Sequence, residues 1–302
     1  MLSIQHIVKE YSQHKALDNV SIEIEKGEIF GLLGPNGAGK TSLIRIINQI
    51  TASDEGIILF NGEKLQQKHI AQIGYLPEER GLYKKMEIGE QVLYLAQLKG
   101  MKKTETLKKL KYWFEKMEME NWWNKKVEDL SKGMQQKVQF VATVIHEPEL
   151  IILDEPFSGF DPVNAETIKN EILELNKNGS TIIFSTHRME SVEQLCHSIA
   201  LIHKAKKILD GKVQDIRNAY KDNSYKVIYS GAVDILIQPK TFTISQMVNK
   251  ENTVELYTKL SAPYNTTNLL TELMQYGQIQ HFEELIPSMN DIFIQKVKQT
   301  NS

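Results

Sequence analysis

A glycine-rich segment at residues 34–42 has the composition and spacing of a loop that binds phosphate. It fits the pattern G-x-x-x-x-G-K-[ST] without a mismatch. Glycines let backbone N–H groups converge on phosphate oxygens, Lys40 supplies a mobile positive charge for the β and γ phosphates, and the Thr41 hydroxyl can bind Mg²⁺. A chance glycine-rich turn is the alternative, and the complete pattern favours nucleotide binding. The predicted nucleotide-binding residues of this loop are Gly34, Pro35, Asn36, Gly37, Ala38, Gly39, Lys40, Thr41 and Ser42.

Two adjacent carboxylates, Asp154 and Glu155, follow the apolar run Leu150–Leu153. Hydrolysis of a phosphoanhydride needs a metal and a group that activates water, so Asp154 is predicted to bind Mg²⁺ and Glu155 to act as general base. His187 ends the next apolar run and could contact the γ-phosphate and orient the water. Taken alone, the acidic pair could start a helix, and a histidine in a turn is common. Together with the glycine-rich loop, these residues favour ATP hydrolysis.

These residues need a scaffold that brings distant segments together, and the apolar pattern predicts an α/β fold. A strand at 28–33 and a helix at 43–50 flank the glycine-rich loop. Strands and helices then alternate between residues 150 and 202, which is typical of a mostly parallel sheet with helices on its faces. Further strands are predicted at 4–8, 20–24, 56–61 and 70–76.

A helical block and a smaller C-terminal region complete the expected organisation. Residues 87–126 are rich in Lys, Glu, Leu and Met and contain no proline, which predicts helices, and another helix is expected at 130–145. The C-terminal region shows no catalytic pattern, and its periodicity predicts strands at 225–229 and 254–257 and a helix at 266–275. We therefore expect a small α+β appendage there.

Composition limits the class of protein. The chain carries 36 Lys and Arg against 38 Asp and Glu, a formal net charge of −2, so no overall attraction to nucleic acid is expected. The single cysteine, Cys196, allows no intramolecular disulfide and fits a reducing cytoplasm. The first residues lack the layout of a signal peptide, and no apolar run is long enough for a transmembrane helix. A role at a membrane would require another chain that crosses it.

Several segments together resemble an ATP-binding-cassette (ABC) ATPase, in the order and spacing of that family. The resemblance covers roughly residues 1–215. The tail Ile-Pro-Ser-Met-Asn-Asp-Ile-Phe at 286–293 resembles the extension of ATP-binding subunits of bacterial exporters of the sodium-extrusion and drug-resistance type. The segments that carry the main resemblance are the loop at 34–42, Leu-Ser-Lys-Gly-Met-Gln at 130–135, Leu-Asp-Glu-Pro at 153–156, Ser-Gly-Phe-Asp-Pro at 158–162 and Ser-Thr-His at 185–187.

The resemblance implies a fold with a P-loop, RecA-like α/β core and a mostly parallel sheet. An antiparallel β subdomain and a helical subdomain at about 80–145 would accompany this core in an ATPase domain at 1–217. Residues 218–302 would form the small α+β domain. The helical subdomain would be the part that docks on a membrane partner, with 77–91 as the conformational relay.

Within this family pattern, Tyr11 matches the aromatic that stacks on adenine, and Glu78 lies where a glutamine that binds the metal is usual. From its spacing alone, Tyr11 could equally cover the core at a strand end. Glu78 can still bind Mg²⁺, but its charge lies beside the phosphates. Lys132 and Met134 also replace a usual glycine and glutamine, so these departures bear on turnover more than on nucleotide binding.

The resemblance further implies that two cassettes pair head to tail. Ser131 and Gly133 of one cassette would close over the γ-phosphate held by Lys40 of the other, and Asp161 would belong to a loop at the interface. A helix amino terminus with a serine hydroxyl suits such an anion. The second cassette could be another copy of this chain or a paired subunit.

We therefore expect a subunit that binds ATP and Mg²⁺ and energises a membrane transporter, an exporter of an ion, drug or small molecule. Its partner would be a separate transmembrane permease, and it would lie in the cytoplasm on the inner face of the membrane. The alternative is an ABC-type ATPase that acts on ribosomes or nucleic acid, which the single phosphate loop and near-neutral charge disfavour. A small-molecule kinase would leave residues 131–133 and the Asp161 loop unexplained.

Overall fold

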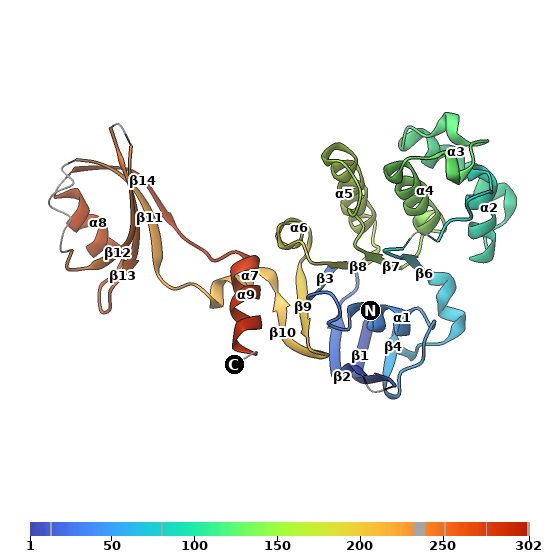
Figure 1. Ribbon diagram of the computed structural model, residues 1–302, viewed down its shortest axis with the longest axis horizontal. Coiled ribbons are helices and arrows are strands. Elements are labelled where there is room, and N and C mark those ends of the chain that lie inside the picture. The colour runs from blue at the N-terminus through green and yellow to red at the C-terminus, as the bar shows by residue number, and fades with distance from the viewer. Residues whose placement is uncertain (13, 80, 232–238, 251, 276, 301–302) are drawn as a thin grey trace. The chain divides into compact units, whose positions relative to one another are not determined.

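The chain folds into two compact units: Met1–Val213 together with Gln299 and Thr300, and Gln214–Lys298. The computed structural model describes residues 1–302 except 13, 80, 232–238, 251, 276 and 301–302 (Figure 1). The division follows Val213, whereas the sequence suggested a boundary after residue 217. The two units are described separately below.

The first unit is built on a six-stranded sheet. Its strands are β3 Ile29–Leu33, β6 Ile73–Leu76, β7 Leu150–Asp154, β8 Thr181–Thr186, β9 Ser198–His203 and β10 Lys206–Lys212. Their order is β10-β9-β3-β8-β7-β6, and every neighbouring pair runs parallel except β10–β9. Every residue of β3 and β7 is buried, which explains the unbroken apolar sequences of Ile29–Leu33 and Leu150–Leu153. The expected mostly parallel sheet is confirmed.

The carboxyl ends of the parallel strands bring the predicted chemical residues to one edge of this sheet. The glycine-rich loop follows β3 and leads into helix α1, Lys40–Ile47. Residue 78 follows β6, Asp154 ends β7, and His187 follows β8. Helices α5, Pro162–Lys177, and α6, Met189–Leu195, continue the alternation after β7 and β8 (Figure 1). Such an edge is where ligands bind in open α/β sheets.

An antiparallel sheet packs beside α1 in the same unit. It consists of β1 Leu2–Tyr11, β2 His14–Ile24, β4 Glu55–Phe60 and β5 Glu63–Lys64, in the order β2-β1-β4-β5. One core cluster joins both sheets, because side chains such as Ile4 and Phe60 belong to it together with Phe30 of β3 and Leu43 of α1. The phosphate loop therefore lies between two sheets that share a single core.

A helical segment follows β6. It contains α2 Ile88–Leu98, α3 Lys103–Lys116 and α4 Lys132–Val144, with short 3-10 turns at Glu120–Trp122 and Val127–Asp129. Trp113 packs edge-on against Phe140 of α4 at 6.2 Å, a contact worth about 1 kcal/mol beyond its buried area. Lys116 connects this segment to α5, because its ammonium lies 2.7 Å from Glu171 and 2.9 Å from Glu174. These contacts hold α3 and α4 in a defined place beside α5.

The second unit is a four-stranded antiparallel sheet covered by a helix. Its strands are β11 Ser224–Gly231, β12 Phe242–Asn249, β13 Val254–Leu260 and β14 Gly277–Glu284, in the order β12-β13-β11-β14, and its helices are α8 Thr266–Met274 and α9 Met289–Gln299. Val227, Leu256, Leu269 and Leu273 are fully buried between the sheet and α8. The expected small α+β fold is confirmed. Helix α7, Val213–Ala219, spans the division between the units.

Several elements differ from those expected. Residues 70–72, predicted as the start of a strand, lie in a 3-10 helix, Gln67–Gln72. A hydrogen bond stabilises the start of this helix, because the His69 ring accepts from the backbone N–H of Gln66 at 3.1 Å. Strands β10, β12 and β14 and helices α7 and α9 were not predicted. No helix within the described ranges is both long and apolar enough to cross a bilayer.

Candidate active site

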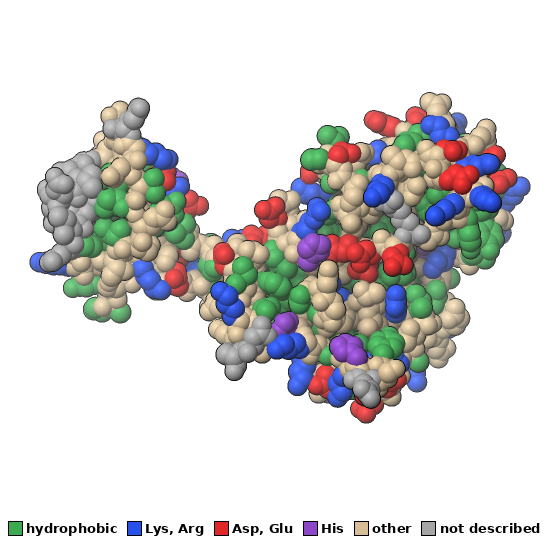
Figure 2. Space-filling view, viewed as in Figure 1, with side chains coloured by type: hydrophobic (Ala, Val, Ile, Leu, Met, Phe, Trp, Pro, Cys, Tyr) green, Lys and Arg blue, Asp and Glu red, His purple; other side chains and the backbone are tan. Residues whose placement is uncertain are grey.

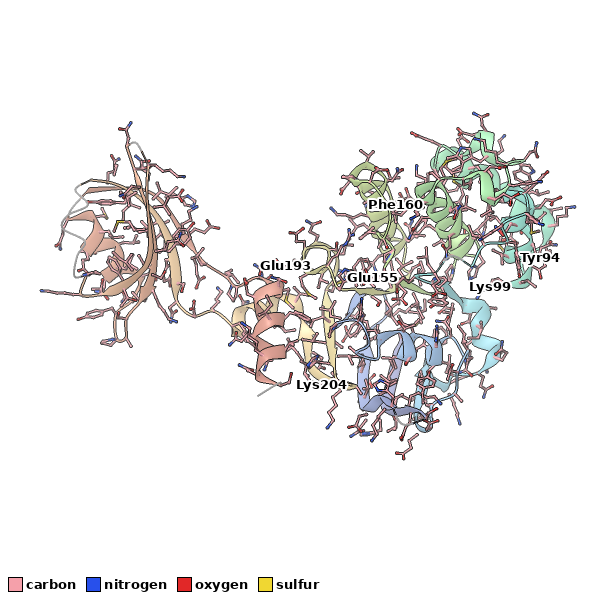
Figure 3. All side chains as sticks on the ribbon, viewed as in Figure 1. Tyr94, Lys99, Glu155, Phe160, Glu193 and Lys204 are labelled. Atoms are coloured by element: carbon pink, nitrogen blue, oxygen red, sulfur yellow. The ribbon has the colours of Figure 1, made fainter. Side chains whose placement is uncertain are left out.

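A pocket of about 280 Å³ lies at the edge where the parallel strands end. Figure 2 shows acidic side chains gathered at the surface near this edge, and Figure 3 labels Glu155 there. Four separate parts of the chain contribute to this one cavity. Its lining residues are Tyr11, His14, Ala16, Asn36, Gly37, Gly39, Lys40, Thr41, Ser42, Glu78, Asp154 and Glu155.

The glycine-rich loop needs glycine where its backbone approaches other strands. Gly34 has φ +149°, and a Cβ there would lie 2.2 Å from the carbonyl oxygen of Ile202. Gly39 has φ +117°, and a Cβ there would lie 2.3 Å from the carbonyl oxygen of Ala16. Only glycine has the freedom and size for both positions. Lys40 is buried, and its ammonium donates to the carbonyl of Gly34 at 2.7 Å.

Replacing Gly39 with alanine is expected to weaken ATP binding. The new methyl group must push the loop away from Ala16, at a cost of about 2 kcal/mol or more, which corresponds to about 30-fold in affinity. Isothermal titration calorimetry measures the effect. Gly27→Ala is the matched control, because Gly27 also has a positive φ (+76°) but has nothing within 4 Å of a Cβ. Equal ATP affinity in the two variants would contradict the packing argument.

The pocket holds more negative than positive charge. Burial raises the pKa of Asp154 above its ordinary value, and the carboxylates of Glu78 and Glu155 add to this rise. Burial lowers the pKa of Lys40, although the same three carboxylates oppose the change. An added cation would relieve the repulsion among the carboxylates. Among the described residues, no three His, Cys, Asp or Glu side chains converge as a metal site made of protein alone.

Glu155 and His187 are in direct contact. The His187 Nδ1 atom lies 2.6 Å from Oε1 of Glu155, and the His187 backbone N–H donates to the same oxygen at 2.9 Å. Glu155 is only 8% exposed, whereas the His187 side chain is 58% exposed. The predicted base and the predicted γ-phosphate contact therefore lie together, with the histidine ring reaching toward solvent. Sequence reasoning did not find the third partner of this carboxylate, Thr186, whose hydroxyl lies 3.2 Å from Oε2.

Tyr11 lies at the mouth of the pocket, at the end of β1. The residue is 39% exposed, and the Lys9 ammonium lies 5.3 Å from the centre of its ring. An exposed aromatic face at a phosphate site is available for stacking on a base. His14 and Ala16 also line the pocket and were not predicted. His14 is the cross-strand partner of Tyr11, a relation that no local sequence pattern signals.

Ser131, Gly133 and Asp161 do not line this pocket. Ser131 caps α4 by accepting from the N–H of Met134 at 3.3 Å. Asp161 caps α5, accepting from the N–H groups of Val163 and Asn164, each at 3.0 Å, and these bonds lower its pKa. Within one chain, the structure therefore keeps these three residues apart from the phosphate loop.

Two links tie the α4 region to the segment that follows Glu155. The Gln136 side chain donates to the carbonyl of Pro156 at 3.0 Å. A Cβ on Gly133 would lie 3.7 Å from the ring of Phe160, which Figure 3 labels. The start of α4 therefore packs on the segment between β7 and α5. Gln136 is a residue that sequence reasoning missed, because a glutamine inside a helix carries no signal of a distant partner.

Comparison with known proteins identifies the family to which the chain belongs. Residues 17–158 match the family model "ABC transporter", and residues 211–297 match the C-terminal domain of DrrA1-3-like ATP-binding proteins. The ABC transporter ATP-binding protein YhaQ of Bacillus subtilis is 41% identical over 98% of both chains. The linearmycin resistance ATP-binding protein LnrL of the same species is 34% identical over 72% of this chain and 70% of its own.

Comparison with solved structures identifies the same family. The ATP-binding subunit of an ABC transporter superposes with a TM-score of 0.68 at 30% identity, over 73% of this chain and 93% of the subunit. The P-loop α/β fold, the antiparallel sheet and the composition of the pocket are consistent with such a cassette. The chain therefore belongs to the ATP-binding proteins of ABC transporters, with a DrrA1-3-like C-terminal domain.

Proposed function

We propose that this chain binds and hydrolyses ATP to energise a membrane exporter of an ion, drug or other small molecule. One observation carries the proposal: the phosphate loop, Asp154 and Glu155 line the same pocket. The exporter direction is supported by relatives such as LnrL, whose name describes resistance to linearmycin. The ATPase domain would comprise residues 1–217, with residues 218–302 as the appended domain.

The pocket supplies each requirement of phosphoanhydride hydrolysis. Loop N–H groups and the Lys40 ammonium would bind the β and γ phosphates, while Tyr11 stacks on the adenine. Glu155 would accept a proton from the attacking water, whose oxygen bonds to the γ-phosphorus as the bond to the β-phosphate oxygen breaks. The exposed ring of His187 would contact the γ-phosphate and hold the water in line. The products are ADP and inorganic phosphate.

The pocket also suits a magnesium ion. Mg²⁺ prefers oxygen ligands and is usually held by one or two carboxylates together with substrate phosphates. The Thr41 hydroxyl and the carboxylates of Asp154 and Glu78 provide such oxygens, and their surplus negative charge fits a divalent cation. When bound, the ion would neutralise charge on the phosphates. Glu78 adds a negative charge at a position where a glutamine side chain would be neutral.

A second cassette would complete the site. Ser131 and Gly133 lie at the amino terminus of α4, where backbone N–H groups favour an anion, yet they lie outside the pocket of their own chain. We therefore assign them to the γ-phosphate bound by another cassette, either a second copy or a paired subunit. Asp161 would lie in the loop at that interface.

An apolar groove of about 370 Å³ is the proposed docking site for the permease. It lies among α2, α4 and the segment after β6, and Ile50 and Leu98 are 61% and 65% exposed there. Lys99, which Figure 3 labels, also lines this groove. An amphipathic cytoplasmic segment of a separate membrane protein would suit it, because large apolar side chains at an exposed groove mark an interaction site.

The groove and the nucleotide pocket meet at consecutive residues. Pro77 lines the groove, and Glu78 lines the nucleotide pocket. Residues 77–91, apart from Arg80, which lies outside the described residues, would act as the relay between them. Within this segment the N–H of Tyr83 donates to the Gln91 side chain at 2.5 Å. Because one peptide bond joins Pro77 to Glu78, a shift of Glu78 toward bound ATP would also displace Pro77 in the groove.

Leu98→Glu is expected to lower recovery of the permease by about 10-fold or more, because burying an unpaired carboxylate against an apolar helix is costly. The experiment is capture of the tagged chain from detergent-treated membranes, with mass spectrometry of the co-purified proteins. The unaltered chain should recover a polytopic membrane protein. This chain would then lie on the cytoplasmic face of that membrane.

Met274→Glu is the matched control, since Met274 is equally exposed at 66% but lies in α8 of the second unit. Its recovery of the permease should equal that of the unaltered chain. Co-sedimentation with ribosomes or nucleic acid, without a membrane protein, would overturn the transporter proposal. Equal loss with both variants would remove the groove as the docking site.

A further inference from the structure

The carboxylate of Glu155 is held on both of its oxygens. His187 contacts Oε1 twice, through its backbone N–H at 2.9 Å and its ring Nδ1 at 2.6 Å. The hydroxyl of Thr186 donates to Oε2 at 3.2 Å. If a phosphate attracts the exposed His187 ring away, the hydroxyl of Thr186 remains on the carboxylate. Thr186 therefore holds the carboxylate independently of where the exposed His187 ring lies.

The surroundings of Thr186 fix the direction of its hydroxyl hydrogen. Thr186 ends β8 and is only 2% exposed. Its Oγ1 accepts from the backbone N–H of Arg188 at 3.1 Å. A hydroxyl carries a single hydrogen, so Oγ1 can accept from Arg188 and still donate that hydrogen to Glu155. The chain turn after β8 thus sets the hydrogen bond that reaches Oε2.

The backbone of Glu155 makes this support necessary. Glu155 has φ +49°, a left-handed conformation that costs a non-glycine residue about 1 kcal/mol or more. Its N–H donates to the carbonyl of Ser185 at 2.9 Å, so the adjacent strand holds its main chain. Such a conformation persists only where neighbours impose it. Strand β8 therefore determines both the main chain and one side-chain oxygen of Glu155.

We propose that Thr186 is a positioning residue for ATP hydrolysis. Its hydroxyl fixes Oε2, so that the carboxylate keeps one orientation toward the attacking water while His187 moves to the γ-phosphate. The inference rests on the proposed role of Glu155 as general base. Thr186 acts through Glu155 and does not itself touch the nucleotide. A purely structural threonine would affect stability and leave the turnover of the folded enzyme unchanged.

Thr186→Val tests this role, because valine has the shape of threonine without the hydroxyl. We expect kcat of the full chain to fall between about 10-fold and 100-fold, the usual effect of a misplaced catalytic group. The affinity for ATP, measured by calorimetry, should stay unchanged. Thr186→Ser restores the hydroxyl and should recover most of kcat. A wild-type kcat for Thr186→Val, or equal losses for valine and serine, would overturn the proposal.

Thr181→Val is the matched control on the same strand. Thr181 is fully buried at the other end of β8, where its hydroxyl oxygen accepts from the N–H of Gly27 at 2.9 Å. The variant loses a comparable hydrogen bond and should retain kcat. If Thr186→Val unfolds at a lower temperature than Thr181→Val, Thr186→Ala is compared with Thr186→Ser at a temperature where both are folded. Equal kcat values for alanine and serine would contradict the positioning role.

A double variant shows whether Thr186 acts through Glu155. In a Glu155→Gln background, Thr186→Val should lower single-turnover hydrolysis no further, and an additional 10-fold loss there would assign Thr186 a different task. The failure of the inference is distinguishable from that of the proposed function. Wild-type turnover in the single variant Glu155→Gln overturns both the proposed role of Glu155 and the inference about Thr186. An inactive Glu155→Gln together with a fully active Thr186→Val overturns only the role of Thr186.

Discussion

Replacing Glu155 with glutamine is expected to leave ATP bound and unhydrolysed. The amide keeps the size of the side chain, but it cannot accept the proton of the attacking water. The loss of a general base typically costs about 100-fold to 10,000-fold in kcat, so turnover should fall by at least about 100-fold. Phosphate release in the presence of Mg²⁺ measures turnover, and calorimetry measures ATP binding, which should be retained.

Size-exclusion chromatography of Glu155→Gln with ATP adds a second readout. If ATP joins two cassettes and hydrolysis separates them, the variant should accumulate as a dimer when ATP is present. Glu166→Gln is the control, since it makes the same chemical change at an exposed position on α5. Turnover at the wild-type rate in Glu155→Gln would remove Glu155 from the role of base.

Replacing Ser131 with arginine is expected to abolish turnover while each single chain still binds ATP. Ser131 lies outside the nucleotide pocket of its own chain, so the change should leave the affinity for ATP intact. A long side chain at this helix start would displace the serine hydroxyl and the helix N–H groups from the γ-phosphate of the other cassette, and would lower kcat at that site by about 100-fold or more. ATPase assays and calorimetry measure the two quantities.

The helix cap provides the control for Ser131→Arg. Ser131 accepts from the N–H of Met134, and losing such a cap costs about 1 kcal/mol of stability. Thermal unfolding should show this modest loss, and assays well below the unfolding temperature exclude it as the cause of inactivity. Unchanged ATPase activity in Ser131→Arg would contradict a site shared between cassettes.

The sequence was sufficient to predict the part of the fold that forms the pocket. Strands β3 and β7 are buried on both faces, so their composition alone distinguishes them from half-exposed strands. Parallel strands end at one edge, so the loop after β3, Asp154 at the end of β7 and His187 after β8 had to converge. The pocket residues that lie close to strand ends were predictable for this reason.

Other elements carried too weak a pattern. Strands β12 and β14 are largely exposed, and each pairs through a register shift, which breaks the alternation of apolar and polar residues. The apolar Ile70 suggested a strand, whereas local hydrogen bonding between Gln66 and His69 favours a 3-10 helix. Short-range side-chain bonds of this kind compete with sheet formation and leave no periodic signal.

The partners of the site residues could not be predicted because they depend on tertiary distances. Thr186 appeared only as part of the motif before His187, and its contact with Glu155 joins residues 31 positions apart. His14 enters the pocket because the pairing of β1 with β2 places it opposite Tyr11. Gln136 reaches Pro156 from the middle of a helix. Each contact requires the folded arrangement of two elements.

Mixing two inactive variants tests the shared site most directly. Lys40→Met removes the phosphate contact of one cassette, and Ser131→Arg blocks the surface that closes on the other. In a mixed dimer, the intact loop of the Ser131→Arg chain faces the intact Ser131 of the Lys40→Met chain. We predict that a 1:1 mixture recovers about a quarter of the wild-type ATPase rate, since half of the dimers are mixed and each has one complete site. A mixture as inactive as either variant alone would contradict the account.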